Sequence, residues 1–375
     1  MYHFCWLEGQ GLVKKIVFVI RHLYGGGAER VTAALANELC KGNEYQVHII
    51  LFSRDKSCEY PLDDRVFCHS MEVQSHRRIQ AIAERCRYLR KVIDSIDPYC
   101  IISLDGIRSI VLTLVSIIGK KRFVVLSERN DPRSHPSSKI LRLLRLWAYS
   151  ICTGVVFQTN EAKSFFPKFI RKKSAVICNP ITSKLPDPYK GRREKRIVNF
   201  CRLVPQKNLD LLIDAFSDIY PFFPEYSLHI YGDGGERERL QIKIEQMGLQ
   251  DKIILHGYSN NIYEDINQAA LFVSSSNYEG ISNSMLEAIA LGIPCICTDC
   301  PAGGARDVIK HGYNGMLVAV GDRNGLSEMM KEVLSNVELS ESLSQGGLVL
   351  RNEICVSEIT KKWIEAMESF VDKKS

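Results

Sequence analysis

Short runs of apolar residues recur along the chain, and segments with apolar positions at helical spacing separate them. In the first half, the runs that we interpret as buried strands are residues 15–20, 45–52, 100–104 and 122–126. Runs of this length that are apolar throughout are typical of strands covered on both faces. Residues 31–39 and 81–93 predict helices between them. This alternation favours right-handed crossovers in a mostly parallel sheet.

Residues 179–195 interrupt the alternation with three prolines, a glycine and a cluster of charges, a composition that suits an interdomain linker. After it the pattern resumes. The later strands are expected at residues 196–200, 226–231, 253–256, 271–274 and 294–298, and helices at 208–219 and 237–246. We therefore assign residues 1–180 to a first domain, 181–195 to a linker, 196–355 to a second domain and 356–375 to a C-terminal helix that packs back on the first domain.

The length of 375 residues fits two α/β domains of typical size better than one core. With 45% hydrophobic and 25% charged residues, the composition is that of a soluble globular protein. No apolar run approaches the roughly 18 residues of a membrane span, and residues 1–8 lack a basic leader, so we expect no signal peptide. The net charge of +6 indicates no nucleic-acid binding but would favour contact with an anionic membrane surface.

Thirteen cysteines, an odd number scattered through expected strands and helices, predict reduced thiols in a cytoplasmic protein. Cys295, Cys297 and Cys300 form a tight group that could hold a metal ion. The first two lie in an apolar run and no fourth ligand follows, so we favour the interpretation that they are small buried hydrophobes.

The most informative segment carries two carboxylates eight positions apart, Glu279 and Glu287, with a helix expected to begin between them. Ser282 or Asn283 can cap this helix, because a short polar side chain accepts from the amides of the first turn. Gly280 has no Cβ and would let a ligand approach the entering backbone. The free amides and the positive end of the helix dipole then form an anion site.

The helix is expected to stop at Gly292, two residues before Pro294. The alternative interpretation is that both glutamates are solvated and that Ser282 is an ordinary cap. We disfavour it because the glycine, the cap and the Gly-x-Pro stop occur together in one stretch. Two carboxylates around an anion pocket suit a sugar joined to a nucleoside diphosphate.

Arg202 and Lys207 follow the first expected strand of the second domain, residues 196–200. They should therefore emerge at the carboxyl edge of the sheet, where a diphosphate would lie. The alternative is an ordinary surface pair near a helix start, but cations there oppose the helix dipole unless an anion joins them.

These segments resemble the Glu-(seven residues)-Glu signature of the retaining, family-4 type glycosyltransferases, which include bacterial surface-glycan glycosyltransferases. The resemblance extends from about residue 197 to residue 318, and Cys201 stands where the family's loop motif has a glycine. It implies the α/β fold called GT-B, in which two Rossmann-like doubly wound domains face each other across a cleft. Ligands bind there, beyond the carboxyl ends of the strands.

By this resemblance Glu279 contacts the transferred sugar, Glu287 binds the ribose hydroxyls, and Arg202 and Lys207 hold the donor diphosphate. Glu279, Arg202 and Lys207 are then the catalytic candidates. The other donor-site candidates are Gly232, Tyr258, Gly280, Ile281, Ser282 and Asn283. The sequence has no Asp-x-Asp signature of metal-dependent transferases. We therefore expect no metal and no cofactor besides the nucleotide-sugar donor.

In the first domain, Gly25, Gly26 and Gly27 open a helix without the spacing of a dinucleotide fingerprint. The resemblance places this loop across the cleft, near the acceptor and the donor phosphates. Glu128 follows another strand, where it could offer a polar contact to the acceptor or form an ion pair with Arg129 or another base.

Residues 139–147 combine Lys139, Arg142 and Arg145 at every third position with Leu141, Leu144 and Trp147. This pattern is typical of a helix that lies on a membrane surface. It also fits a helix packed on its own sheet with a snorkelling polar face, and the sequence leaves both interpretations open.

The resulting hypothesis is a cytoplasmic, peripherally membrane-associated glycosyltransferase. It would move a hexose or N-acetylhexosamine from a nucleotide donor, UDP above all, to a lipid-linked sugar during surface polysaccharide assembly (lipopolysaccharide or capsule). A GT-B sugar-nucleotide epimerase or hydrolase and a non-catalytic binding protein are the alternatives. The first-domain loops, which decide the sugar, the acceptor and the linkage, are the part of the sequence that indicates least.

Overall fold

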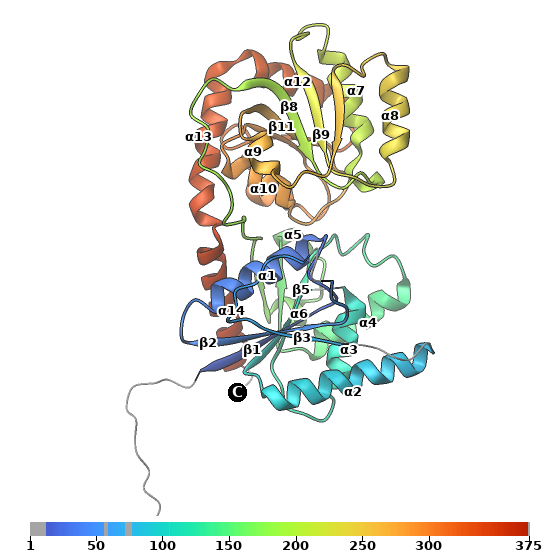
Figure 1. Ribbon diagram of the computed structural model, residues 1–375, viewed down its shortest axis with the longest axis vertical. Coiled ribbons are helices and arrows are strands. Elements are labelled where there is room, and N and C mark those ends of the chain that lie inside the picture. Colours follow the sequence, from blue (N-terminus) through green and yellow to red (C-terminus); the bar gives the residue numbers. More distant parts are fainter. Residues whose placement is uncertain (1–12, 56–58, 72–76, 105, 374–375) are drawn as a thin grey trace, which may run out of the picture.

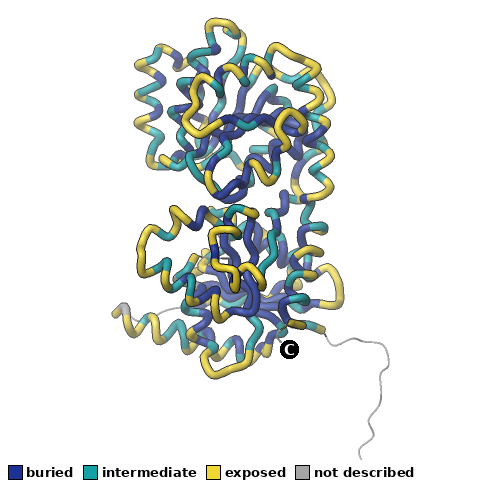
Figure 2. Tube along the Cα trace, turned by 180° about the vertical axis from the view of Figure 1, so that it is seen from behind, coloured by how far each residue is buried: buried dark blue, intermediate teal, exposed yellow. Residues whose placement is uncertain are grey.

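The structure is a computed structural model, and it describes residues 13–55, 59–71, 77–104 and 106–373. Residues 1–8, for which we expected no leader, lie outside these ranges. Two α/β domains lie one above the other in Figure 1, with the second domain uppermost. The tube in Figure 2 shows buried strands inside each domain and exposed positions on the surrounding helices and loops.

The first domain is built on a seven-stranded parallel sheet. Its strands are β1 (Lys14–Ile20), β2 (Tyr45–Leu51), β3 (Phe67–Ser70), β4 (Cys100–Ser103), β5 (Val124–Glu128), β6 (Gly154–Phe157) and β7 (Ser174–Val176). Its helices are α1 (Gly27–Leu39), α2 (Arg78–Ile96), α3 (Ile107–Ser116), α4 (Lys139–Ile151), α5 (Asn160–Ser164) and α6 (Lys168–Arg171). The strand order is β3-β2-β1-β4-β5-β6-β7, and apolar clusters fill both faces of the sheet.

The second domain repeats the plan with a six-stranded parallel sheet. Its strands are β8 (Glu194–Phe200), β9 (Ser227–Tyr231), β10 (Ile253–Gly257), β11 (Ala269–Ser274), β12 (Cys295–Thr298) and β13 (Met316–Val318). Its helices are the 3₁₀ turn η1 (Pro205–Lys207), α7 (Leu209–Ile219), α8 (Arg237–Gln246), α9 (Ile262–Ile266), α10 (Asn283–Ala290), α11 (Gly304–Val308), α12 (Arg323–Ser335) and α13 (Val337–Glu353). The strand order is β10-β9-β8-β11-β12-β13.

Both orders are those of a doubly wound fold, so the expected fold class is confirmed. In each sheet the order reverses beside the first strand, between β1 and β4 and between β8 and β11. The connections from these two strands diverge to opposite faces, which leaves a crevice beyond their carboxyl ends. In the second domain, the loops that border this crevice carry Lys207 and Glu279.

The linker is less polar in its contacts than its composition suggests. Ile181 and Leu185 are buried in the apolar cluster around α10. The backbone amide of Ile181 donates to the carbonyl of Ile354 at 2.9 Å, and the Arg351 guanidinium donates to the Leu185 and Pro186 carbonyls. The second-domain sheet begins at Glu194, two residues before the expected strand.

The last helix, α14 (Val356–Asp372), leaves the second domain and packs on the first. Figure 1 shows α13 beside the upper domain and α14 beside the lower one, both in red. Trp363, Met367 and Phe370 of α14 join the apolar cluster between α1 and the first sheet. Gly154 is the β6 residue under Phe370, and a Cβ there would lie only 2.1 Å from the ring.

Several elements were not expected from the sequence. The strands β3, β6, β7 and β13 and the helices α5, α6, α9 and α11 have three to five residues each, too few to show a periodicity. The longer helices α3, α12 and α13 were not among the expected elements either. Helix α2 extends three residues beyond the expected 81–93 at each end.

The cysteine group behaves as a buried apolar set. Cys295 and Cys297 lie inside β12, and burial raises the pKa of both thiols. Among the described residues no group of three or more His, Cys, Asp or Glu is placed to hold a metal ion. None of the described helices has the length and apolar character that a membrane span requires.

Candidate donor site between the two domains

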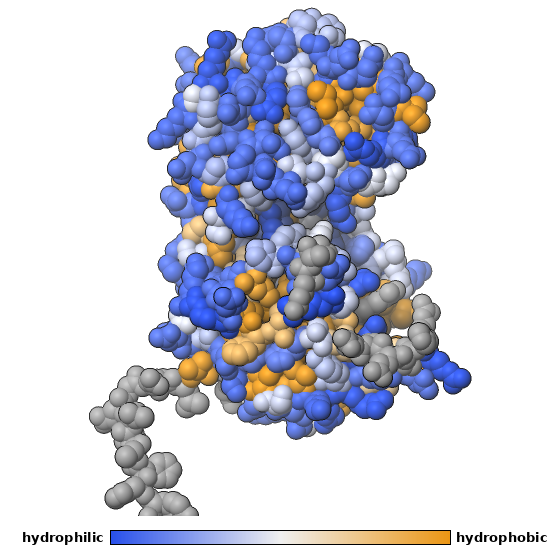
Figure 3. Space-filling model, in the orientation of Figure 1, coloured by the Kyte–Doolittle hydropathy of each residue, from blue (hydrophilic) through white to orange (hydrophobic). Residues whose placement is uncertain are grey.

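A cavity of about 1000 Å³ lies between the domains, and loops at the carboxyl ends of both sheets line it. Figure 3 shows the outline of the molecule narrowing between its upper and lower halves. The second domain contributes residues 200–202, 206–207, 279–284 and 287, and the first contributes the glycine loop and the segments after β4, β5 and β6.

Lys207 and Glu279 form a two-pronged ion pair in the crevice between the ends of β8 and β11. The Lys207 Nζ lies 2.6 Å and 2.7 Å from the two carboxylate oxygens of Glu279, and the Ser276 hydroxyl donates to the second oxygen at 3.1 Å. Burial acts to lower the pKa of Lys207, but the Glu279 carboxylate outweighs it, so the pKa lies above its usual value. The lysine is therefore charged, and Glu279 holds it in place.

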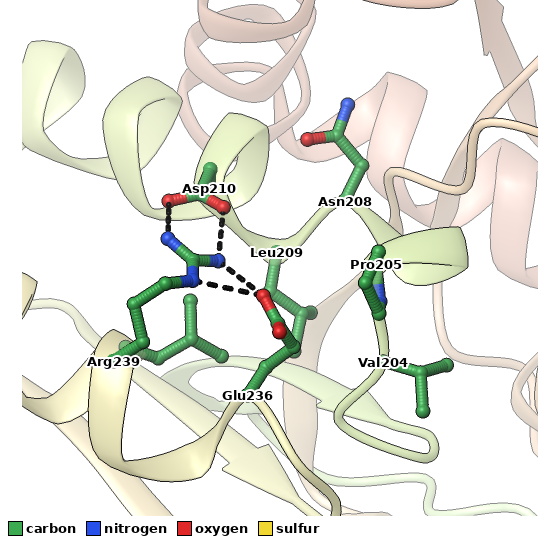
Figure 4. Close-up of a pocket in the computed structure, with 8 residues that line it drawn as sticks. Val204, Pro205, Asn208, Leu209, Asp210, Glu236 and Arg239 are labelled. Atoms are coloured by element: carbon green, nitrogen blue, oxygen red, sulfur yellow. Dashed lines mark hydrogen bonds and ion pairs between the residues drawn. The ribbon is translucent and has the colours of Figure 1, made fainter.

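Arg202 stands on the same loop, is exposed and lines the cavity. It forms no ion pair with any residue that the structure describes. Figure 4 shows how the neighbouring backbone is fixed: the Arg239 guanidinium donates to both oxygens of Asp210 at 3.0 Å and 2.6 Å and to Glu236 at 2.8 Å. This fork joins the starts of α7 and α8 beside Asn208, where the loop ends. The loop that carries Arg202 is thus held in place, and the Arg202 guanidinium lines the cavity without an ion-pair partner among the described residues.

Helix α10 begins at Asn283, and Ser282 is its N-cap, with its hydroxyl accepting from the Met285 amide at 3.4 Å. Of the two caps that the sequence allowed, the structure has the first. The helix ends before Gly292, whose φ of +67° is the left-handed conformation expected of a C-terminal glycine. Glu287 lies one turn into this helix.

Gly280 lies against the first domain. A Cβ on it would come within 2.3 Å of the Gln158 Oε1 and 2.9 Å of the Arg129 carbonyl oxygen. The next amide, of Ile281, donates to the same Gln158 oxygen at 3.4 Å. The missing Cβ of Gly280 thus permits a close approach to the other domain, at a position where we expected a ligand.

Asn179 joins these parts from the linker side. Its side-chain oxygen accepts from Gln158 at 2.7 Å and from the Arg129 guanidinium. Its amide donates to the Asn283 Oδ1 at 2.8 Å and to the Ile281 carbonyl at 3.4 Å. Asn179 is only 3% exposed, so this hydrogen-bonding centre is internal to the domain interface.

Glu287 is 2% exposed and forms an ion pair with Arg30 of helix α1 in the first domain. The Tyr263 hydroxyl accepts from the same Arg30 group at 3.3 Å. Burial raises the pKa of Glu287, and the Arg30 guanidinium acts in the opposite direction. The carboxylate expected at the ribose is therefore already engaged across the interface.

The glycine loop lies where it was expected, across the cavity. Gly25, Gly26 and Gly27 all line it, and Gly26 caps α1 without a side chain. A Cβ on Gly27 would lie 2.9 Å from the Asn283 side-chain nitrogen. The first turns of α1 and α10 therefore face each other at close range.

Glu128 also lines the cavity, but it is a buried ion-pair member. Its carboxylate accepts from Arg145 at 3.0 Å and from the Tyr149 hydroxyl at 3.2 Å, and burial raises its pKa. Of the alternatives for this residue, the ion pair is the one present, with Arg145 in place of Arg129.

Two expected donor-site residues do not line the cavity. Gly232 packs under the Arg202 loop, where a Cβ would lie 1.9 Å from the Cys201 carbonyl oxygen. It supports the loop from behind. Tyr258 is 82% exposed after β10, outside the cavity wall.

Residues 139–147 lie in α4, but their cations do not share an exposed face. Arg145 is 3% exposed, and besides Glu128 it donates to two backbone carbonyls. Of the two interpretations left open for this helix, Arg145 fits packing on its own domain, because its charge is paired inside that domain. Leu141 and Leu144 are partly buried. The exposed apolar side chains of the helix are Ile140, Leu143, Trp147 and Ile151.

Sequence reasoning missed the part that four residues play at the interface: Arg30, Gln158 and Asn179 had no role in it, and Arg129 was considered only as a partner of Glu128. Gln158 directly follows β6, Arg129 directly follows β5, and Asn179 lies three residues beyond β7. A polar residue just after a buried strand was the available signal, but β6 and β7 were themselves too short to be recognised.

Comparisons with known proteins agree with this geometry. Residues 185–348 match the family model described as glycosyl transferases group 1. A Campylobacter jejuni α-1,4-N-acetyl-D-galactosaminyltransferase, named for GalNAc-α-(1→4)-GalNAc-α-(1→3)-diNAcBac-PP-undecaprenol, is 26% identical over 358 residues, covering 94% of this chain and 97% of the relative.

A second C. jejuni protein, named N-acetylgalactosamine-N,N'-diacetylbacillosaminyl-diphospho-undecaprenol 4-α-N-acetylgalactosaminyltransferase, is 24% identical over 350 residues, covering 88% of this chain and 93% of the relative. The crystal structure of Anabaena HepE in complex with UDP and glucose superposes with a TM-score of 0.78 at 17% identity. It covers 95% of this chain and 100% of HepE.

Fold, cavity and matches together define a glycosyltransferase of the GT-B fold. The match to the group 1 model covers residues 185–348, which lie mainly in the second domain. The family resemblance read from residues 202–207 and 279–287 is thereby confirmed.

Proposed function

We propose that this enzyme is a retaining glycosyltransferase that moves a hexose or N-acetylhexosamine from a UDP-sugar to a lipid-linked sugar in surface polysaccharide assembly. The observation that carries the proposal is the Lys207–Glu279 pair beside the free Arg202 at the switch point of the second sheet. A nucleoside diphosphate placed there would meet two cations and the first turn of α10.

The chemistry follows from charge. As the bond to the diphosphate breaks, negative charge grows on the leaving oxygen and positive charge on the anomeric carbon. The negative charge on the leaving oxygen is stabilised by Arg202, Lys207 and the amides at the start of α10. Preorganised electrostatics acts in this way in other enzymes. Glu279, which Lys207 holds in place, lies on the side of the anomeric carbon, where the positive charge develops. These cations take the place of a metal ion, so the reaction is metal-independent.

Among the described carboxylates of the cavity wall, Glu128, Glu279 and Glu287 each hold a cation, and Glu29 lies beside His22. In the proposed mechanism a donor phosphate oxygen therefore takes the acceptor's proton, on the same face from which the diphosphate leaves. Attack on that face retains the anomeric configuration.

The names of similar proteins support the choice of substrates. HepE was crystallised with UDP and glucose, and both C. jejuni relatives are named for undecaprenol diphosphate-linked sugars. A lipid-linked acceptor places the enzyme at the cytoplasmic face of the membrane.

Helix α4 presents Ile140, Leu143, Trp147 and Ile151 to solvent, and Phe169 on the adjacent α6 is 55% exposed between exposed Lys168 and Arg171. Apolar side chains next to basic ones suit docking on an anionic bilayer.

Transfer is tested by mixing a panel of UDP-sugars with polyprenyl diphosphate-linked sugars and following products by mass spectrometry. We expect a product larger by one sugar, formed equally with and without EDTA. Lys207→Ala should abolish it. Conversion of the donor alone would favour the epimerase or hydrolase, and no binding of any nucleotide sugar would favour a binding protein.

Docking is tested by flotation with anionic vesicles. Replacing Leu143 and Trp147 together by serine should release the protein from vesicles while UDP binding persists. The matched control replaces exposed Ile242 of α8, in the second domain. If the double variant floats with vesicles like the parent, the α4 face has another role.

A further inference from the structure

The cavity wall carries a half-buried arginine that has no counter-charge among the described residues. Three cations of the cavity wall are matched by carboxylates, Lys207 by Glu279, Arg30 by Glu287 and Arg145 by Glu128. Arg129 lines the same cavity and forms no ion pair with any described residue. Its sole hydrogen bond from the side chain, within the described part of the chain, goes to the neutral Asn179 amide. Its Nη1 is buried with no partner there.

Leaving a guanidinium in this state is unfavourable, because a buried charge is stable only when it is paired or well hydrogen-bonded. Burial lowers the pKa of Arg129 to about 10, which still leaves the side chain charged at neutral pH. The one nearby acidic group, Glu29, acts on it only through space. Among the described residues Arg129 therefore lacks a negatively charged partner in contact with it.

The surroundings of Arg129 indicate where that charge comes from. Its carbonyl abuts Gly280, the residue after Glu279. Its guanidinium shares Asn179 with Asn283, the first residue of α10. An oxyanion bound at the start of α10 would thus lie within reach of a cation from the opposite domain.

We propose that Arg129 binds the diphosphate of the nucleotide donor from the first-domain side. This inference rests on the proposed function, and it adds a donor-binding residue to it. Arg202 and Lys207 approach the diphosphate from the second domain and Arg129 from the first, so the diphosphate ties the domains together. The donor's charge replaces the missing counter-ion, and closure of the domains is favoured when the nucleotide is present.

The test is calorimetry on the full-length protein with UDP and with uridine, which lacks the phosphates. In the parent, UDP should bind more tightly than uridine. In Arg129→Gln, which keeps a donor for Asn179, this preference should fall by about tenfold or more, the usual scale of a charge-assisted hydrogen bond. Uridine binding should not change. Arg129→Lys should keep part of the preference, because it restores the charge without the fork.

The matched control is Arg122→Gln, at the opposite end of β5 and paired with Asp97. It should leave the preference for UDP intact. An unchanged preference in folded Arg129→Gln would overturn the inference alone, whereas a parent that binds no UDP would overturn it together with the proposed function. A carboxylate on the donor sugar is the other possible oxyanion. If Arg129→Gln weakens UDP-glucuronate and leaves UDP and UDP-glucose untouched, the assignment to the diphosphate is wrong.

Discussion

Replacing Arg30 by alanine should destabilise the protein in a pH-dependent way. Glu287 is 2% exposed, and Arg30 supplies its charge partner from the other domain. Removing one member of a buried ion pair costs roughly 3–5 kcal/mol, because the other charge stays buried alone. Arg30 keeps 20% of its side chain exposed and the domains can part to admit water, so we expect the lower end, about 3 kcal/mol.

The sign of the pH dependence follows from Glu287. Burial raises its pKa in the folded state, and Arg30 restrains that rise. A carboxyl whose folded pKa lies above its unfolded value binds a proton more readily in the folded state. Its contribution to stability is therefore lost as the pH rises through the interval between the two values. Without Arg30 this interval extends upward. The destabilisation should be large at pH 8 and shrink toward pH 5, where Glu287 can take up a proton.

The assay is scanning calorimetry of the parent and Arg30→Ala at pH 5 and pH 8. A loss of about 3 kcal/mol should lower the melting temperature of the second domain by roughly 6–12 °C at pH 8, on the scale of 2–4 °C per kcal/mol for domains of this size. Adding Glu287→Gln should recover most of the loss, because no buried charge then remains. The matched control is Arg323→Ala, which breaks the more exposed pair with Asp218 and should cost less than about 1 kcal/mol.

Two results would refute this reasoning. Equal destabilisation of Arg30→Ala at pH 5 and pH 8 would show that the lost energy is packing and not the charge of Glu287. A double variant no more stable than Arg30→Ala would show that the two side chains are not coupled.

Three further predictions concern the same cavity. Arg202→Ala should lower kcat by about 10²–10³, the cost of one lost donor to a developing anion, with the fold unchanged by circular dichroism because the side chain is exposed; normal turnover would remove it from the site. Glu287→Gln should weaken UDP binding measured by calorimetry. Glu279→Gln should leave the affinity for UDP nearly unchanged but lower the rate of sugar transfer. Equal losses of UDP affinity in the two variants would contradict this division of roles. Gly280→Ala should cost about 1–3 kcal/mol of thermal stability, since its Cβ would lie 2.9 Å from a backbone carbonyl of the first domain; a neutral effect would mean that the domains are not held at this contact.

The second-domain half of the site could be predicted from the sequence because its determinants are local. Lys207 and Arg202 lie within seven residues after β8, and Glu279, Ser282 and Glu287 lie within nine residues of one another. Strand ends, a cap and a helix start fix their positions before any long-range contact is considered. The doubly wound class follows in the same way from the alternation of apolar runs and helical segments.

Local patterns were weaker guides at other positions. Gly232 of the second domain was a donor-site candidate, but its missing Cβ makes room for the Cys201 carbonyl. Arg145 looked like a surface cation by its spacing in α4, yet it neutralises Glu128 inside the domain. A periodic pattern shows that a helix is amphipathic, and it does not show which neighbour each polar side chain meets.

The sequence by itself thus determined the longer strands of both sheets, their parallel arrangement and the cluster of charges after β8 and β11. Only the tertiary structure decided the partners across the cavity, Arg30 with Glu287, Gln158 with Ile281, and Asn179 with Asn283. These pairs are separated by more than 100 residues along the chain. Their meeting depends on how α14 and the linker set one domain against the other, and no local spacing or propensity encodes that arrangement.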